Sequence, residues 1–180
     1  AGTLAFEMSS GRHRLVINCG CHPDDDPAWR DRLRGTAAHS TMTVDGLDSA
    51  EIEAEGVGRG AETVSAERRQ ADGNVWLDLA HDGYASTLGL VHERRLYLAA
   101  SGDDFRGEDQ LVGAGGQAFA LRFHLHPSIQ ASLNQAQTAV LLKPPSGRGW
   151  QMQAMGGVLG LEESVTFIGQ DRKRTDQIVV

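Results

Sequence analysis

The sequence predicts an all-β protein: an antiparallel two-sheet β-sandwich with at most one or two short helical turns. Apolar residues recur at every second position in several short runs, which is the period of a strand that buries one face. Turn-forming residues, 22 glycines and 5 prolines among 180 residues, break these runs roughly every 10 residues, as in sandwiches and barrels. No sustained apolar stripe has helical spacing. A chain of this length fits one domain, which we expect to cover residues 1–180.

The first element that the alternation predicts is a β-hairpin. Residues 3–9 place Leu4, Phe6 and Met8 on one face, and the alternation resumes after a Ser-Gly turn in residues 12–19. Two alternating runs separated by a short turn are typical of paired antiparallel strands. We therefore expect these two runs to form a hairpin at one edge of a sheet.

The segment after the hairpin is predicted to hold a short helical turn and then a strand. A polar, proline-bounded loop covers residues 22–29, and residues 27–35 can form the helical turn. Residues 38–46 read as a strand closed by an Asp-Gly turn pair, and residues 47–60 are an irregular connection rich in Gly and Glu. The remaining strands are predicted at 74–84, 88–102, 117–127, 137–145, 149–155, 162–169 and 175–180.

Composition and charge exclude several classes of protein. The net charge of −7 and the isoelectric point of about 5.4 argue against a general nucleic-acid binder, which needs a basic face. No apolar run approaches the roughly 18–20 residues that span a bilayer, so we expect no membrane span. The first residues carry no secretory signal and read as the middle of a strand. We therefore expect the chain to be a piece of a longer protein.

Histidine and arginine side chains are the candidates for a functional site. In the strand that follows the helical turn, parity places His39, Thr41 and Thr43 on a polar face, where substrate or metal can reach the imidazole. The alternative is a surface histidine that is hydrogen-bonded to a neighbouring threonine. Arg34 is near in sequence, and a fold that brings it close to His39 creates a site for a carboxylate or a sulfate. The alternative for Arg34 is a solvated cation that Asp31 neutralises.

A second group of histidines lies on the predicted strand 117–127. Parity places His124 and His126 together on the face opposite the core. Two histidines in this arrangement can ligate zinc or iron, as in cupin-type jelly rolls, if a third ligand arrives from another strand. The alternative is an ordinary polar outer face. We expect His81 and His92 to be structural, with hydrogen bonds to a carbonyl or a carboxylate.

Two stretches of the sequence resemble the C-terminal β-sandwich of the heparinase II/III-like family. The first is LAFEMSSGRHRLVINCG at residues 4–20, and the second is LRGTAAHSTMTVDGLDSAE at residues 33–51. In the family, a strand pair that ends in V-D-P-G is followed by a segment that contains A-H-N-T. The later segments HDGY, GLVHERRLYL, GEDQLV and RFHLHP are similar to the bacterial branch, so the resemblance covers essentially the whole chain.

The resemblance implies a polysaccharide lyase that is assembled from two parts. An N-terminal helical toroid, which would precede this chain, carries a tyrosine and an asparagine or histidine that act on the sugar, and the sandwich closes the cleft. Such enzymes cleave acidic polysaccharides that contain uronic acid, of the heparin, heparan or alginate type, by β-elimination. A base removes the proton next to the carboxylate, a cation neutralises that carboxylate, and an acid protonates the leaving oxygen. We expect the isolated sandwich to be inactive.

The resemblance also implies roles for individual residues. The histidine of A-H-N-T is His39, which is a catalytic residue and a metal ligand in this assignment. The aspartate of V-D-P-G falls at Asn18, and a further histidine ligand falls at or before Ala1. The metal in family members is commonly zinc, which orders the loops around the site. Arg34 is expected to contact the carboxylate of the substrate.

An alternative interpretation is a non-catalytic carbohydrate-binding or structural module. The amide of Asn18 is a neutral and weaker ligand than the aspartate of the family, which favours a site that no longer holds metal. Aromatic residues make up only 6% of the chain, which disfavours a large stacking platform for sugars. Three tryptophans, Trp29, Trp76 and Trp150, are nevertheless available for stacking.

Overall fold

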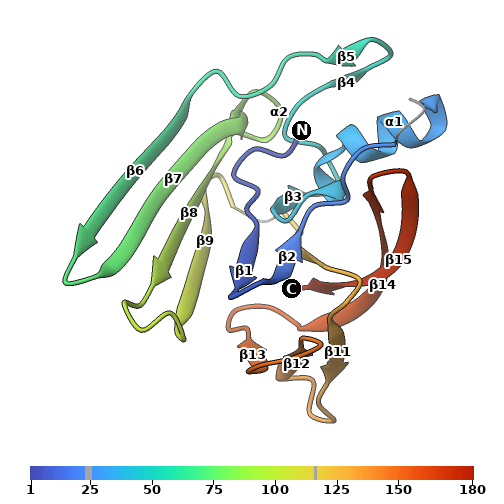
Figure 1. Ribbon diagram of the computed structural model, residues 1–180. Helices are drawn as coiled ribbons and strands as arrows, with labels where there is room; N and C mark the ends of the chain where they lie inside the picture. The colour runs from blue at the N-terminus through green and yellow to red at the C-terminus, as the bar shows by residue number, and fades with distance from the viewer. Residues whose placement is uncertain (23–25, 116) are drawn as a thin grey trace.

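The computed structural model describes residues 1–22, 26–115 and 117–180, and it confirms the all-β class (Figure 1). Within these residues, a six-stranded antiparallel sheet is accompanied by sheets of four, three and two strands. The central, six-stranded sheet consists of β1 (Met8–Ser10), β2 (His13–Ile17), β10 (Phe119–Leu125), β15 (Asp171–Val179) and β14 (Gly160–Ile168), with β3 (Met42–Val44) beside the start of β10. The four-stranded sheet consists of β6 (Val64–Ala71), β7 (Asn74–Tyr84), β8 (Leu90–Leu98) and β9 (Phe105–Gly113). The smaller sheets consist of β11 (Gln130–Leu133), β12 (Ala139–Lys143) and β13 (Trp150–Gln153), and of β4 (Ile52–Glu53) and β5 (Gly56–Val57).

Helical structure in the described residues is limited to three short segments. These are α1 (Pro27–Arg34), the 3-10 turn η1 (Thr36–Ala38) and α2 (Ala85–Leu88), of which α2 was not predicted. The side chain of Asp26 accepts a hydrogen bond from the backbone N–H of Ala28, and Pro27 occupies the first helical turn. Both features stabilise a helix start at this position. The middle of the polar loop predicted over 22–29 lies outside the described residues, as does Gly116 in the loop after β9.

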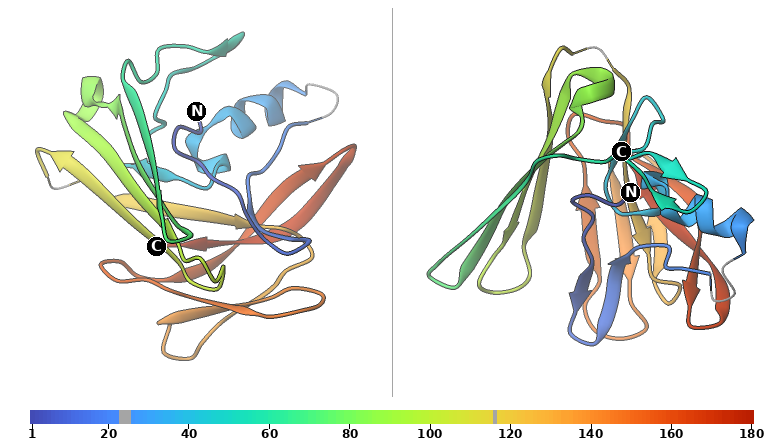
Figure 2. Two further views of the ribbon diagram at one scale, coloured as in Figure 1. Left: turned by 60° about the vertical axis from the view of Figure 1, so that its left-hand side comes forward. Right: turned by 90° about the horizontal axis from the view of Figure 1, so that it is seen from above.

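Three clusters of buried apolar side chains hold the sheets together. The largest packs the central sheet against β11–β13 and contains Leu15, Val16, Phe123, Leu125, Ile129, Val140, Leu142, Leu159 and Ile178. The second packs α1 and η1 on the central sheet and contains Cys19, Leu33, Ala38 and Phe167. The third joins β3 to the four-stranded sheet through Met42, Val44, Tyr84 and Leu90. β3 is therefore one of the elements through which the four-stranded sheet contacts the rest of the molecule, and that sheet stands as a separate leaf in Figure 2.

Several elements differ from the sequence expectations. The strands β6, β9 and β11 were not predicted. β6 is an edge strand whose residues are all exposed, so its sequence has no buried face and shows no apolar alternation. β3 is also shorter than the strand predicted over 38–46, because residues 36–38 form η1.

The predicted polar face of this strand is wrong for its two threonines. Thr41 and Thr43 are both buried, because β3 is covered on both sides. The hydroxyl of Thr41 donates to the carbonyl of Thr3, and the hydroxyl of Thr43 donates to the carbonyl of Ala120. Strand parity separates two faces, but it does not state that either face meets solvent.

A buried arginine on β8 links the four-stranded sheet to the segment beside β3. The side chain of Arg94 is 0% exposed, and its Nε donates to Asp109 on β9 at 2.7 Å. Its Nη1 donates to the backbone carbonyls of Leu4 at 2.8 Å and of Ser40 at 3.0 Å. The guanidinium also lies 5.4 Å from the centre of the Phe6 ring. One side chain thus joins the sheet to the N-terminal segment and to the segment that contains His39.

Two buried histidines extend this network and confirm the structural role predicted for them. The backbone N–H of Gly83 donates to Nδ1 of His81 at 3.0 Å, so the neutral ring carries its proton on Nε2. That proton is donated to Nδ1 of His92 at 3.2 Å, and His92 in turn donates from Nε2 to Asp109 at 2.7 Å. Burial raises the pKa of Asp109, but the hydrogen bond from His92 and the charge of Arg94 outweigh it and hold the pKa below its usual value. The carboxylate therefore stays ionised and compensates the buried guanidinium.

We predict that Arg94→Ala lowers the free energy of unfolding by about 3–5 kcal/mol, because it leaves the Asp109 carboxylate buried without its cation. The matched control is Arg95→Ala, at the next residue, whose side chain is 60% exposed and whose loss is expected to cost at most about 1 kcal/mol. Urea denaturation of both variants measures the difference. Equal losses at the two positions would contradict the role assigned to Arg94.

Candidate functional site

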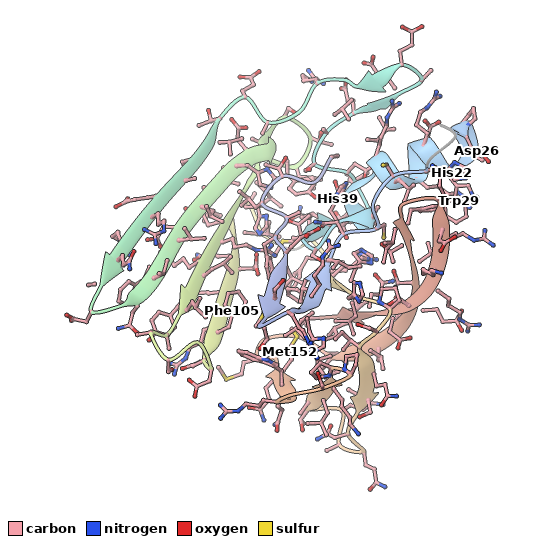
Figure 3. All side chains as sticks on the ribbon, in the orientation of Figure 1. His22, Asp26, Trp29, His39, Phe105 and Met152 are labelled. Atoms are coloured by element: carbon pink, nitrogen blue, oxygen red, sulfur yellow. The ribbon has the colours of Figure 1, made fainter. Side chains whose placement is uncertain are left out.

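His39 follows η1 and lies where the N-terminal segment passes between α1 and the four-stranded sheet (Figure 3). Its backbone N–H donates to the carbonyl of Thr36 at 3.0 Å. Its imidazole packs on Gly2, where an added Cβ would lie 2.6 Å from Cγ of the ring. The residue is half-buried, not sealed among aliphatic side chains. Glycine at position 2 is therefore what allows the ring to occupy this place.

The electrostatic surroundings favour the neutral form of His39. Burial lowers the pKa of His39, while a hydrogen bond with the backbone of Leu33 and the carboxylate of Asp48 act in the opposite direction with smaller effect. Asp48 is held in place because its Oδ1 accepts the backbone N–H of Thr36 at 2.5 Å. A neutral imidazole can accept a proton, as a general base must. Asp48 lies in the segment 47–60, for which an irregular connection is predicted, and no pattern in the sequence signals its position.

Arg34, in the last turn of α1, adjoins the same N-terminal segment. Its carbonyl accepts a hydrogen bond from the amino group of Ala1. Its guanidinium approaches Asp31 only at 4.0 Å, and the Nη1 atom is buried with no hydrogen-bond partner among the described residues. A buried guanidinium nitrogen without a partner is energetically costly. Arg34, through its carbonyl, and His39, through its ring, thus both adjoin the backbone of residues 1–2, which brings both predicted residues to one region.

Asn18 is also brought to this region, but its side chain is already engaged. Its Oδ1 accepts the backbone N–H of Ser40 at 2.8 Å, and its Nδ2 donates to Oε1 of Glu7 at 3.3 Å. Among the residues that the structure describes, no group of three or more His, Cys, Asp or Glu side chains is placed to hold a metal ion. The described residues alone therefore do not fit a zinc site formed by His39 and Asn18.

His124 supports the segment before His39. The ring lies under η1, where Nε2 donates to the carbonyl of Ala37 at 2.9 Å and Nδ1 accepts from the hydroxyl of Ser164 at 2.8 Å. Burial lowers its pKa to about 4. The expectation that His124 shares an exposed face with His126 is wrong, because η1 covers this end of β10 and His124 is buried. Both ring nitrogens of His124 are occupied, so the arrangement does not support a cupin-like metal centre.

The fold and the site define a β-sandwich domain with the architecture of the sandwich found in polysaccharide lyases. The chain belongs to the heparinase II/III-like family: the family model described as "Heparinase II/III-like, C-terminal" matches residues 1–180. Within the described part of the chain, no helix is long and apolar enough to cross a membrane.

This chain is similar to a curated protein and to two crystal structures of a lyase. FtsZ-localized protein C of Caulobacter vibrioides is 35% identical over 198 residues, which cover 100% of this chain and 34% of that protein. This chain therefore spans about a third of the length of the curated relative. The crystal structure of the heparan sulfate lyase HepC from Pedobacter heparinus superimposes with a TM-score of 0.78 at 16% identity, over 97% of this chain and 27% of HepC. A mutant of HepC gives a TM-score of 0.75 at 14% identity and the same coverage, and at this level of identity both structures show the fold alone.

We predict that acidification destabilises the protein between about pH 6.5 and pH 4 through its buried histidines. Burial lowers the pKa values of His81 and His124 from 6.5 to about 4. In this window the unfolded chain binds protons that the folded chain does not, so the free energy of unfolding falls as the pH falls. Each such histidine contributes up to about 1.4 kcal/mol per pH unit.

Urea denaturation at a series of pH values tests this prediction. His124→Gln is expected to be less stable at pH 7 but to show a shallower loss on acidification, because one titrating group has been removed. His13→Gln, at the turn of the first hairpin, is the control and is expected to keep the full slope. A His124→Gln slope as steep as that of the unsubstituted protein would refute the assignment.

Proposed function

We propose that this domain is the C-terminal sandwich of a polysaccharide lyase that cleaves uronic-acid-containing polysaccharides by β-elimination. In this proposal the domain works together with an N-terminal helical toroid and is inactive without it. The family and the fold support a link to polysaccharide lyases. The observation that carries the proposal is the position of Arg34 and His39 beside the same N-terminal segment. Arg34 is a cation whose buried Nη1 has no hydrogen-bond partner in the described residues, and His39 is a half-buried imidazole whose pKa is lowered by burial.

The chemistry of β-elimination assigns one task to each of these side chains. The guanidinium of Arg34 pairs with the uronate carboxylate, which lowers the pKa of the proton on the neighbouring carbon. The neutral imidazole of His39 takes that proton, and the electron pair left behind forms a carbon–carbon double bond. The glycosidic C–O bond on the next carbon breaks, and an acid from the toroid protonates the leaving oxygen. The proton, the electron pair and the leaving group are thereby all accounted for.

A second candidate function is a non-catalytic glycan-binding or structural module. The specific observation in its favour is Asn18, which stands where the family has an aspartate and whose Oδ1 is used to hold the backbone of Ser40. The curated relative, moreover, is named for its localisation with FtsZ and not for an enzymatic activity. In this alternative, the protein binds an acidic glycan at Arg34 and releases no product.

The activity test compares the full-length protein with residues 1–180 on heparan sulfate, heparin, alginate and polygalacturonate, and follows the ultraviolet absorbance of the unsaturated uronate. We expect turnover only by the full-length protein. His39→Ala is expected to lower kcat about 10²–10⁴-fold, as is typical for loss of a general base. The rate of the unsubstituted enzyme should fall only below pH 6.5, because His39 must be neutral and its pKa is lowered by burial.

Two controls separate the outcomes. His126→Ala removes a ring that, within the described residues, hydrogen-bonds to Ser128 in the following turn, and it should leave kcat unchanged. Arg34→Lys keeps the positive charge but loses the forked geometry of the guanidinium, so it should raise KM. Full turnover by the isolated domain contradicts the division of labour. Binding of acidic glycans by the full-length protein without any product selects the second candidate.

A further inference from the structure

Trp29 on α1 is the meeting point of two arginines that lack a carboxylate partner in the described part of the chain. The guanidinium carbon of Arg32 lies 5.9 Å from the centre of the indole ring, and that of Arg172 lies 5.4 Å from it. Arg32 is one helical turn after Trp29, and Arg172 lies at the start of β15. The two cations therefore come from elements far apart in the sequence and are gathered on one ring, at the place labelled Trp29 in Figure 3.

The ring that gathers these cations is fixed by the core beneath it. Trp29 packs against Phe167 at the end of β14, with ring centres 5.2 Å apart and the ring planes at 71°. Leu33, one turn further along α1, belongs to the same buried cluster. An edge-to-face contact of this kind holds both rings in a defined orientation. The indole is therefore a fixed surface, and part of it is exposed to solvent.

Arginines elsewhere on the surface show what the usual arrangement is. A hollow of about 400 Å³ on the outer face of the four-stranded sheet is lined by arginines and aromatic rings. There Arg69 pairs with Asp78 at 2.7 Å, and Arg106 pairs with Asp104 at 2.6 Å while it lies 5.8 Å from the Tyr97 ring. These cations are neutralised within the protein. The two at Trp29 have no such partner in the described part of the chain, although the chain carries a net charge of −7 and acidic side chains are plentiful.

Two unneutralised guanidiniums on one aromatic ring are suited to an anionic ligand. Each gains only about 0.5–1 kcal/mol from an exposed ring, and their mutual repulsion acts against this gain. A carboxylate or sulfate placed between them removes the repulsion and forms charge-assisted hydrogen bonds. A pyranose ring attached to that anion can rest on the exposed part of the indole, which supplies a flat apolar surface.

We propose that Trp29, Arg32 and Arg172 form a subsite for one acidic unit of a saccharide chain, separate from the region of Arg34 and His39. The identity of the ligand as an acidic saccharide rests on the proposed function. Arg32 and Arg34 are two residues apart on a helix, so they point to different faces of α1. The width of a helix, about 10 Å, then separates the two regions. A chain of several sugar units that is bound at Arg34 can thus reach Trp29 with a second acidic unit.

The test is isothermal titration calorimetry of the full-length protein with three tetrasaccharides at low ionic strength. The probes are an alginate tetramer, which carries carboxylates, a heparin-derived tetramer, which also carries sulfates, and neutral cellotetraose. The Arg32→Gln/Arg172→Gln double variant is expected to bind the acidic tetramers roughly tenfold more weakly, with its melting temperature unchanged. Arg106→Gln is the matched control, because that arginine also lies on an aromatic ring but is paired with a carboxylate.

Each of four results would overturn the subsite, and the first three concern affinities. They are undiminished affinity in the double variant, an equal loss in Arg106→Gln, and cellotetraose binding as tight as that of the acidic tetramers. Displacement of the alginate tetramer by an acidic peptide of equal charge and at equal concentration would also overturn it, because a saccharide site must use the ring as well as the charge. The relative response to the alginate and heparin tetramers separates carboxylate from sulfate recognition.

The result of the test of the subsite can be distinguished from the result of the test of lyase activity. If the enzyme is a lyase and the subsite exists, the double variant raises KM and leaves kcat unchanged, because the subsite is remote from the reacting bond. If no product forms with any polymer, a tenfold loss of tetrasaccharide affinity in the double variant still supports the subsite. If product forms but affinity and KM do not change in the double variant, the subsite is refuted and the lyase proposal stands.

Discussion

The position of the candidate site depends on one buried ion pair, between Arg94 and Asp109. A guanidinium that is fully withdrawn from water is strongly unfavourable unless a carboxylate and further acceptors surround it. Here Asp109 supplies the charge, and the backbone carbonyls of Leu4 and Ser40 both accept from Nη1, while Nη2 has no hydrogen-bond partner in the described residues. Since neither carbonyl belongs to the four-stranded sheet, the arginine can be satisfied only when that sheet and the N-terminal segment are both in place. The ion pair therefore couples the arrangement of the sheets to the backbone next to His39.

The backbone around His39 is held from several directions by hydrogen bonds with side chains from different elements. Arg94 holds the carbonyl of Ser40, while the amide of Asn18 holds its N–H. The hydroxyl of Ser40 donates to the carbonyl of Ile17, and His124 donates to Ala37 in η1. A side chain on a backbone fixed in this way loses little freedom when it binds a ligand. The amide of Asn18 has a structural role, because it accepts the backbone N–H of Ser40. An asparagine in place of the aspartate of the family is therefore compatible with an ordered site.

The distribution of charge separates the surface into two kinds of region. On the outer face of the four-stranded sheet, cross-strand ion pairs such as Arg69 with Asp78 neutralise the arginines. Around α1, Arg32 has no carboxylate partner in the described residues, Arg34 approaches Asp31 only at 4.0 Å, and Arg172 joins them from β15. A protein with an overall negative charge repels polyanions only within the screening length of about 8–10 Å at physiological salt. Local cations therefore decide where an acidic chain can bind, and here they are gathered at α1.

The sequence by itself determined the all-β class, the first hairpin, the helical turn after Pro27 and the structural role of His81 and His92. Each of these follows from local rules: alternation with period two, turn residues, a proline-bounded loop, and the position of a histidine on an apolar strand face. The family resemblance, drawn from motifs near His39, also came from the sequence. The sequence did not reveal the exposed strand β6, since an edge strand with no buried face leaves no alternation of apolar residues to detect.

The tertiary structure alone decided which polar groups are buried and which meet one another. Parity placed Thr41 and His124 on open faces, yet both are buried, because β3 and β10 are covered on two sides by elements remote in sequence. The contact of Asp48 with η1 and the gathering of Arg32 and Arg172 on Trp29 likewise join residues from distant elements. Local patterns fix which side chains share a face of one strand or helix. Only the packing of whole elements fixes what covers that face, and hence whether a charge there is neutralised, buried or left for a ligand.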